Sequence, residues 1–217
     1  MTKVKIEIKN RLTGDVLFEY EKENNTIKDT LREGVKRGVD FSGAYLPDVD
    51  LVNADLKRID LHGAYLVRAN MVGANLGWAN LENANLRGAR LVGANLRSAN
   101  LSNTKLGGVN MRGADLRDAK LEGYDLRGVN LKGADIDSAD LGEFGKLKGV
   151  LIIGCIGSRR EYSRIFKTDK GIFVQCGCYK GSVDEFVDKV KETHKGNTHE
   201  RDYLAMIEFA KIKFQEE

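Results

Sequence analysis

Apolar residues recur at every fifth position through the middle of the chain. From Phe41 to Leu141, all 21 positions of this series carry Leu, Met, Ile or Phe. A helix places apolar residues at steps of three and four, and a half-buried strand places them at steps of two. A sustained step of five fits neither element, so the backbone is expected to turn once in every five residues.

Two further positions of each five-residue unit are restricted. The residue two before the apolar one is mostly Ala, and the residue directly before it is mostly Asn or Asp, as in Ala74, Asn75 and Leu76. Tyr124 departs from the first rule, and its ring is too large for the space of a small side chain. We predict that Tyr124 stacks on Phe144, twenty residues further on, at a structural junction.

This pattern of Ala, then Asn or Asp, then Leu resembles the pentapeptide-repeat family over residues 39–143, about half of the chain. The resemblance implies a right-handed quadrilateral β-helix, a solenoid in which each pentapeptide forms one side and four pentapeptides form a coil. It also implies that the large and the small residue of each unit point inward. If neighbouring coils are spaced like neighbouring strands, about 4.8 Å apart, the rod is about 25 Å long. The fold class is therefore expected to be mainly β.

The residues before the repeats predict a cap. Alternating apolar residues over 4–8 and 16–20 flank a polar turn, which is typical of a β-hairpin. A short helix is expected next, with Thr26 as its N-cap and Gly38 at its end. The end of a repeat rod exposes apolar interior and unpaired backbone, so residues 1–38 are expected to cover the N-terminal end.

Residues 144–217 depart from the repeat and predict a separate small α+β domain. Ser182 and Glu185 have the spacing of a capping box at the start of a helix, and a second helix is expected from about Glu200, with Phe209 among its apolar contacts. This domain is expected to cap the rod and to offer a recognition surface or a homodimer contact. Three segments predict strands: 150–153, 164–166 and 172–176.

Composition indicates where in the cell the protein is expected. The 31% of charged residues, and the lack of any apolar run near the roughly 20 residues of a membrane-spanning helix, argue against a membrane protein. The N-terminus does not resemble a secretory signal. Three cysteines are an odd number and do not make a disulfide framework, so a cytoplasmic location is expected. A net charge of +3 does not by itself indicate nucleic acid as a partner.

Stacked coils would place residues twenty apart above one another, so outward positions form ladders. One ladder carries three valines followed by Arg112 and Lys132. Exposed Trp and clustered apolar side chains are typical of protein interfaces, and Arg58, expected one coil from Trp78, could stack on its ring. The alternative is that β-branched residues simply suit a β surface. The predicted protein-binding patch comprises Val52, Val72, Val92, Val67, Trp78 and Arg58.

Basic residues form a second candidate surface. Such residues can attract the phosphates of nucleic acid. Carboxylates are interleaved with them, however, because residues 39–143 hold 12 basic and 14 acidic side chains. An ordinary salt-bridged surface is therefore favoured, and nucleic acid is not the expected partner. The predicted basic stripe comprises Arg87, Arg97, Arg112, Arg117, Arg127 and Lys132.

Residues that could carry metal or catalytic chemistry lie in the C-terminal region. The spacing of its cysteines and histidines does not match a familiar zinc site, so buried thiols are favoured and no metal or cofactor is expected. The segment 154–160 is rich in Gly and Arg but is a weak candidate for a phosphate loop, because no helix is expected to follow it. The candidate zinc ligands are Cys155, Cys176, Cys178, His194 and His199.

The sequence favours a non-enzymatic protein-interaction scaffold, of the phage or bacterial type, that acts by binding a partner protein. Two alternatives stay open. Some pentapeptide-repeat proteins are acidic rods that mimic DNA and inhibit a type II topoisomerase, so a topoisomerase-directed or nucleic-acid-directed protein is one alternative. The balanced charge of these repeats departs from that pattern. The other alternative is a zinc-binding or enzymatic C-terminal domain.

Overall fold

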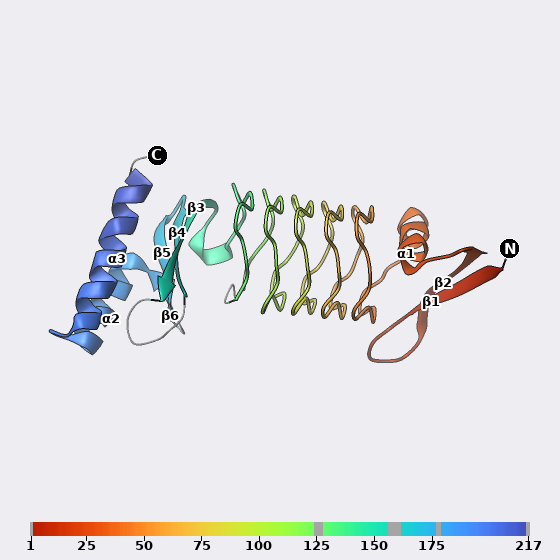
Figure 1. Ribbon diagram of the computed structural model, residues 1–217, viewed down its shortest axis with the longest axis horizontal. Helices are drawn as coiled ribbons and strands as arrows, with labels where there is room; N and C mark the ends of the chain where they lie inside the picture. Colours follow the sequence, from red (N-terminus) through yellow and green to blue (C-terminus); the bar gives the residue numbers. More distant parts are fainter. Residues whose placement is uncertain (1, 124–127, 156–161, 177–178, 216–217) are drawn as a thin grey trace. The chain divides into compact units, whose positions relative to one another are not determined.

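The computed structural model describes residues 2–123, 128–155, 162–176 and 179–215. The chain forms two compact units, Met1–Gly142 and Glu143–Glu217. The first unit contains an N-terminal hairpin and helix followed by the repeats, and the second contains a sheet and two helices (Figure 1). Within the described residues, no helix has the length and apolarity that crossing a membrane requires.

The N-terminal segment is the predicted hairpin and helix. Strand β1 (Lys3–Lys9) pairs antiparallel with β2 (Val16–Glu23), and α1 (Ile27–Lys36) follows. Thr26 caps α1, because its hydroxyl accepts a hydrogen bond from the backbone NH of Asp29 at 3.1 Å. Gly38 lies just beyond the helix with φ of 69°, as expected of a glycine that ends a helix.

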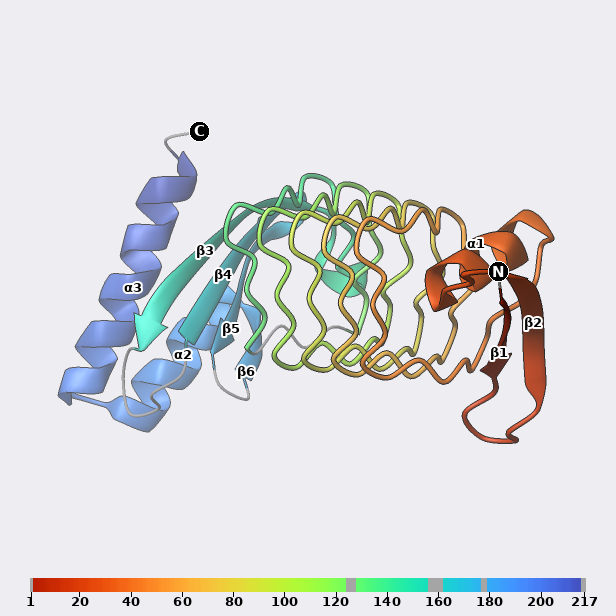
Figure 2. The same cartoon turned by 45° about the vertical axis from the view of Figure 1, so that its right-hand side comes forward.

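The hairpin and helix cover the beginning of the repeats (Figure 2). Phe41 is fully buried, its ring lies edge-to-face on Phe18 of β2 at 6.1 Å, and Gly34 of α1 approaches it so closely that a Cβ there would overlap the ring. Asn10 forms an antiparallel bridge with Ala44. The apolar interior at this end of the repeats is therefore covered by side chains from the preceding segment.

The repeats form stacked coils of four pentapeptides. Parallel bridges join residues that are 20 apart, from Tyr45 and Tyr65 to Lys120 and Asp140. In most of the described pentapeptides, the carbonyl of the central residue also accepts a hydrogen bond from the NH three positions on, as Leu51 does from Ala54 at 3.0 Å, and this bond closes the turn. The chain therefore turns every five residues and returns above itself after 20.

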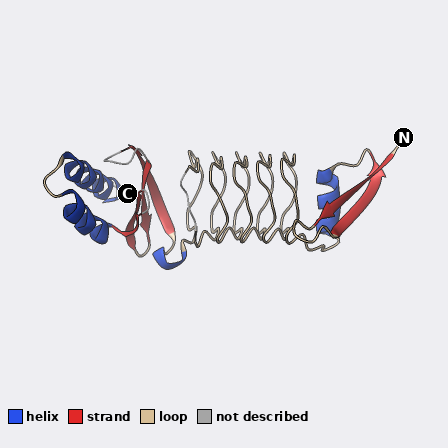
Figure 3. Ribbon diagram, turned by 90° about the horizontal axis from the view of Figure 1, so that it is seen from below, coloured by secondary structure: helices blue, strands red, loops and turns tan. Residues whose placement is uncertain are grey.

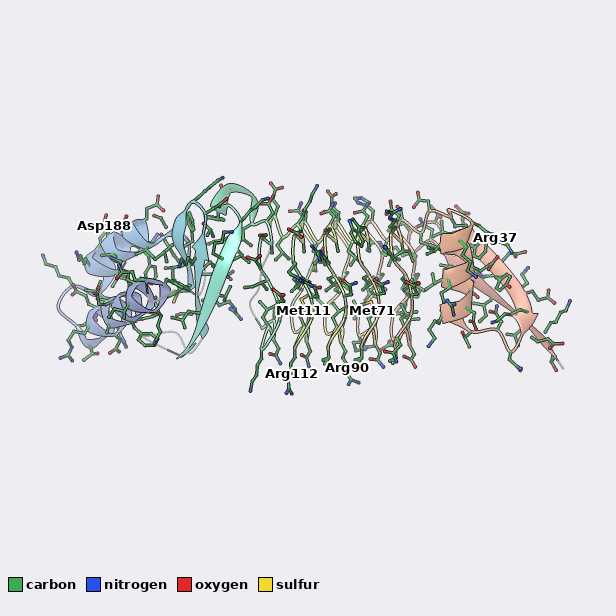
Figure 4. The ribbon with its side chains drawn as sticks, turned by 90° about the horizontal axis from the view of Figure 1, so that it is seen from above. Arg37, Met71, Arg90, Met111, Arg112 and Asp188 are labelled. Carbon is green, nitrogen blue, oxygen red and sulfur yellow. The ribbon has the colours of Figure 1, made fainter. Side chains whose placement is uncertain are left out.

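The interior of the coils is a packed column of the large repeat residues. From Phe41 to Leu121, the described central residues are at most 3% exposed, whereas Leu131 and Ile136 in the last coil are half-buried. Figure 4 shows Met71 and Met111 among the coils, in the same ladder of central positions. Alternating large and small inward residues fill this interior at the close packing that protein cores require.

The repeats differ from ordinary β structure in one respect. They form isolated bridges between turns rather than continuous strands, so Figure 3 draws them as loops, and the regular strands all belong to two antiparallel sheets elsewhere. The reason is that a turn follows every bridged residue within two positions, which leaves no room for a longer ladder. The right hand and the four-sided cross-section stay predictions of the family resemblance.

The second unit is a four-stranded antiparallel sheet with two helices on one face. The sheet has the order β3-β4-β5-β6, and the helices pack on it through a core that includes Ile165, Val174, Phe186, Tyr203 and Met206 (Figure 3). The helix-capping prediction is confirmed, because Ser182 and Glu185 form both bonds of the capping box. The elements are β3 (Leu147–Cys155), β4 (Tyr162–Thr168), β5 (Gly171–Cys176), β6 (Tyr179–Ser182), α2 (Val183–His194) and α3 (Thr198–Gln215).

Three details of this unit differ from the sequence predictions. Strand β6 was not predicted, because its four residues include no apolar run. Phe209 is 46% exposed instead of contributing to the core, and Met206 occupies the core instead. Phe144 packs edge-to-face on Phe173 at 4.9 Å, while its predicted partner Tyr124 lies outside the described residues.

Candidate interaction surfaces

Each pentapeptide presents its outward side chains from a tight turn. For the central residues from Phe41 to Ile136, the second residue after the central one has φ between 53° and 72°, which is the left-handed region. Glycine adopts this conformation at no steric cost, whereas other residues are strained there. Of the 20 described positions from 43 to 138, ten hold Gly and ten hold Asn, Asp, Ser, Arg or, with φ of 58°, Trp78.

The Asn or Asp before each central residue has a structural role. Its side-chain oxygen accepts a hydrogen bond from the backbone NH two positions on: Asn95 accepts from the NH of Arg97 at 3.0 Å, and Asp140 accepts from the NH of Gly142 at 2.9 Å. Side chains of this kind hold turns by such local bonds. Amide groups also link neighbouring coils, since Asn95 donates to the Asn75 side chain at 3.1 Å. Conservation of these residues along the chain therefore reflects folding rather than a site.

Pentapeptides that are 20 residues apart stack into four rows, and we name each row after one of its outward residues. A row comprises a central residue, the residue before it and the two after it. The chain visits the rows in the order histidine, tyrosine, valine, tryptophan. The central residues of the histidine row are Phe41, Leu61, Leu81, Leu101, Leu121 and Leu141, and those of the tyrosine row are Leu46, Leu66, Leu86 and Leu106. Those of the valine row are Leu51, Met71, Leu91, Met111 and Leu131, and those of the tryptophan row are Leu56, Leu76, Leu96, Leu116 and Ile136.

Trp78 is the most prominent exposed side chain of the tryptophan row. It is 48% exposed, and the Nζ atom of Lys57 lies 4.7 Å from its ring centroid. The cation over the ring is thus Lys57 and not Arg58, which was predicted to stack there. The reason is that Gly77 lies directly above Lys57 in the next coil and has no side chain, so the lysine can extend across it to the ring.

The other members of the predicted patch lie in two more rows. Val52, Val72 and Val92 follow one another along the valine row and are half-buried, and Val67 lies in the tyrosine row. The ammonium of Lys28 in α1 donates to the carbonyl of Val52 at 2.9 Å, so the N-terminal helix approaches the first valine. The structure therefore distributes the six predicted residues over three neighbouring rows.

A pair of stacked tyrosines was missed by the sequence reasoning. Tyr45 and Tyr65 lie one above the other in the tyrosine row, with ring centroids 5.5 Å apart and planes inclined by 22°, and Tyr45 is 55% exposed. The signal was present, because the two residues are 20 apart at the position that mostly holds Asn or Asp. A comparison of residues 20 apart at the position before the central residue predicts that the two tyrosines stack.

The predicted basic stripe is divided by the coil geometry. Arg97 and Arg117 belong to the tryptophan row and pair with carboxylates there: Arg97 with Asp118 at 3.6 Å, and Arg117 with Asp115 at 2.6 Å and Asp135 at 3.3 Å. The side-chain hydrogen bonds from Arg117 hold the pKa of Asp115 below its usual range. These two arginines match the expected salt-bridged surface.

The remaining members of the stripe lie elsewhere. Arg87 belongs to the tyrosine row, Arg112 and Lys132 belong to the valine row, and Arg127 lies outside the described residues. Arg90 and Lys105 were not part of the prediction but lie in the same two rows. The bases of these rows are therefore separated from the paired arginines of the tryptophan row.

Comparison with known proteins identifies the repeats. The family model for pentapeptide repeats matches residues 37–73, 74–113 and 110–143. A pentapeptide repeat protein from Nostoc PCC 7120, of known structure, is 38% identical and aligns with 48% of this chain and 93% of its own, with a TM-score of 0.26. The chain belongs to the pentapeptide-repeat family. The rows described above are therefore made of pentapeptide repeats.

Two further pentapeptide repeat proteins of known structure are similar to the chain. Rfr23 from the cyanobacterium Cyanothece 51142 is 27% identical, with 51% of this chain and 95% of that protein aligned and a TM-score of 0.37. A protein from the Arabidopsis thaliana thylakoid lumen is 34% identical, with 52% and 70% aligned and a TM-score of 0.29. Among curated proteins, none matches the chain.

The C-terminal cysteines and histidines lie outside the pentapeptide-repeat match. The Cys176 thiol accepts a hydrogen bond from the Ser163 hydroxyl at 3.1 Å, and the rings of His194 and His199 are 5.7 Å apart. Cys178 and the side chain of Cys155 are outside the described part of the structure, as is most of the segment 154–160. Among the side chains that are described, no three or more His, Cys, Asp or Glu come together as a metal site would require.

Proposed function

We propose that this pentapeptide-repeat protein is a non-enzymatic protein-interaction scaffold and that Trp78 anchors its partner. The proposal includes a right-handed quadrilateral β-helix whose rows form rigid, flat sides. The family match and the stacking of residues 20 apart support that geometry. The single observation that carries the proposed function is the exposed ring of Trp78 with the Lys57 ammonium over it.

Trp78 combines exposure with an unfavourable backbone. A residue with a Cβ costs about 1 kcal/mol or more in the left-handed region. The other non-glycine residues described at this turn position are Asn, Asp, Ser and Arg, so Trp78 is the one bulky apolar side chain among them. An outward ring adds nothing to the packing of the coil interior. A strained residue that the fold does not require is a reason to infer a function, and Trp is among the residues most enriched at interface hot spots.

The surroundings of Trp78 indicate the chemistry of the partner. Lys57 lies over the ring, and Arg58 is exposed one coil away in the same ladder as Trp78. An apolar ring beside two cations suits a partner segment that has an apolar side chain next to a carboxylate. We propose a partner protein that presents such a segment.

The test compares two glycine substitutions in one ladder. Trp78→Gly removes the ring and suits the backbone, and Ser98→Gly makes the same backbone change in the next coil, where φ is 57°. The wild type and both variants, each carrying an affinity tag, would be used to recover partners from the source cells, with quantification by mass spectrometry. We expect a protein whose recovery falls at least about tenfold with Trp78→Gly and is unchanged with Ser98→Gly.

Equal recovery with all three proteins would overturn the role of Trp78. Including an untagged second copy of the chain in the same experiment tests the homodimer contact predicted for the C-terminal domain. The cytoplasmic location and the phage or bacterial origin stay predictions of the sequence.

A further inference from the structure

The four rows of the repeats differ sharply in charge. Counted along the sequence from residue 40 to residue 140, the tyrosine and valine rows carry 7 basic and 3 acidic residues, and the tryptophan and histidine rows carry 5 basic and 10 acidic residues. The tyrosine and valine rows are neighbours, because the chain passes directly from one to the other in every coil. A balanced total thus conceals a basic flank and an acidic flank.

The excess of basic residues is concentrated in the later coils. On the tyrosine and valine rows between residues 85 and 133, the described side chains include five bases and no acid. All five are exposed, and none forms an ion pair with a described residue. Figure 4 shows Arg90 and Arg112 pointing away from the coils in the same direction. We name this set the basic surface: Arg87, Arg90, Lys105, Arg112 and Lys132.

The basic surface also has few projecting side chains at its turns. Gly88, Gly93, Gly108, Gly113 and Gly133 occupy its turn positions, where any larger residue would project. Gly107 lies beneath the side chain of Arg87, whose Nε would be 3.9 Å from a Cβ built there. The guanidinium therefore lies along the next coil, and a flat ligand could approach the backbone and the cations together.

We propose that the basic surface binds the phosphate backbone of nucleic acid. Arg pairs with phosphate through two parallel hydrogen bonds, and Lys contributes a point charge. Neighbouring coils about 4.8 Å apart would present these cations on two adjacent rows as a compact set. Since the surface offers no ladder of groups that could read bases, recognition is expected to be independent of sequence.

The composition of the surface favours nucleic acid over an acidic protein. Protein interfaces have an apolar core with aromatic anchors, whereas interfaces with nucleic acid are more polar and strongly positive. Between residues 85 and 133, the described outward side chains of these two rows are Asn, Arg and Lys, with Val92 half-buried among them. Trp78 lies on a different row, so this site is separate from the proposed protein anchor.

The test removes three charges without disturbing the repeat pattern. The variant combines Arg87→Val, Arg90→Asn and Arg112→Val. Each new residue is of the type found one coil earlier in the same ladder, at Val67, Asn70 and Val92. The control is the triple variant Arg97→Gln, Arg117→Gln and Lys120→Asn, which has the same net charge but changes the other two rows. Binding to labelled duplex DNA, single-stranded DNA and poly-glutamate would be measured by fluorescence anisotropy over a range of salt.

Wild type is expected to bind DNA at about 50 mM salt, with an affinity that falls steeply as salt rises. The basic-surface variant should bind at least about tenfold more weakly, and its slope of log affinity against log salt should be shallower by about 2 to 3. The control variant should match the wild type. Stronger binding of duplex or of single-stranded DNA identifies which source of phosphate is preferred, and either supports the proposal.

Three results would overturn it. The first is that neither DNA binds the wild type at low salt, and the second is that both triple variants bind DNA equally weakly. The third is that poly-glutamate binds as tightly as DNA, which would assign the surface to an acidic protein. If the triple variant does not fold, Gly107→Glu serves instead, because a Cβ there has room and the carboxylate would lie beside Arg87. It should weaken DNA binding several-fold, and Trp78→Gly should not.

Discussion

Leu91 in the repeats and Phe186 in the C-terminal unit are both buried, but their neighbours arise in different ways. Leu91 lies between Met71 and Met111, the residues 20 before and 20 after it, so its surroundings follow from the period of the sequence. Phe186 packs on Tyr179 at 5.0 Å and on Tyr203 at 5.7 Å, which come from β6 and α3. No regular spacing predicts that cluster.

This contrast separates structural from functional positions in the repeats. Inward positions are nearly equivalent, so Leu, Met, Ile and Phe exchange there while the coil is preserved. Outward positions are not required by the coil and can diverge from row to row. In the C-terminal unit, by contrast, each core residue has a unique environment, and its neighbours must match its shape.

The largest effect is expected from placing a charge inside the coils. Leu91→Asp should destabilise the repeats by about 5 kcal/mol or more, since it removes buried apolar surface and leaves a carboxylate without a partner. Urea unfolding followed by the fluorescence of Trp78, the one tryptophan of the chain, measures the change.

The neighbouring residue provides the control. Arg90→Asp introduces the same side chain at an outward position where Asp50 occurs in the first coil, so stability should change little. A large loss with Arg90→Asp, or none with Leu91→Asp, would contradict the inward and outward assignment on which both proposed surfaces depend.

A smaller effect is expected from the core of the C-terminal unit. Phe186→Ala should destabilise that unit by about 3–5 kcal/mol through lost contacts with the tyrosines. Far-ultraviolet circular dichroism follows its helices, α2 and α3, and Trp78 fluorescence follows the repeats. We expect the helical signal to be lost at lower urea while the fluorescence transition stays in place. If both transitions move together, the two units unfold as one and the contrast between them fails.

The smallest effect concerns the paired surface of the tryptophan row. Arg117 lowers the pKa of Asp115, so the folded coils bind a proton there less readily than the unfolded chain. The pair therefore adds stability above the ordinary pKa of Asp, about 4, and that stability is lost as the pH falls through the lowered value. Because the pair is partly exposed, Asp115→Asn should cost less than about 1 kcal/mol at neutral pH and nothing in acid.

Unfolding of the repeats at several pH values measures this difference. Asp115→Asn keeps the side-chain oxygen that accepts from the Arg117 backbone NH at 3.1 Å, so the turn itself is preserved. Asp137→Asn in the same row is the control for loss of a carboxylate that forms no ion pair with Arg117. A difference between Asp115→Asn and the wild type that persists in acid would refute the assigned cause.

Much of the fold could be predicted from the sequence, because the repeats encode it locally. The period of five fixes which residues point inward, and the caps at Thr26 and Ser182 follow from side-chain bonds to nearby backbone groups. Strand β6 and the exposure of Phe209 could not be predicted in the same way. Both depend on which side chains from distant elements fill the core of the C-terminal unit.

The candidate surfaces were predicted less well, and the reason is geometric. Charges of both signs are mixed along the sequence, whereas the coil distributes them over rows, so a near-neutral stretch becomes a basic flank and an acidic flank. Lys57 reaches the ring of Trp78 because Gly77 has no side chain. Lys57 and Gly77 belong to a different ladder from Arg58 and Trp78, so comparing residues within the ladder of Trp78 points to Arg58 instead.

The twenty-residue repeat distance also restricts how the gene for such a protein can lengthen or shorten. Duplication of one pentapeptide inside the coils would shift every later residue to the adjoining row, and the basic flank would be broken at that point. Duplication of four pentapeptides would extend the rod by one coil and leave every ladder continuous. The length of the scaffold can therefore change in whole coils without loss of its surfaces.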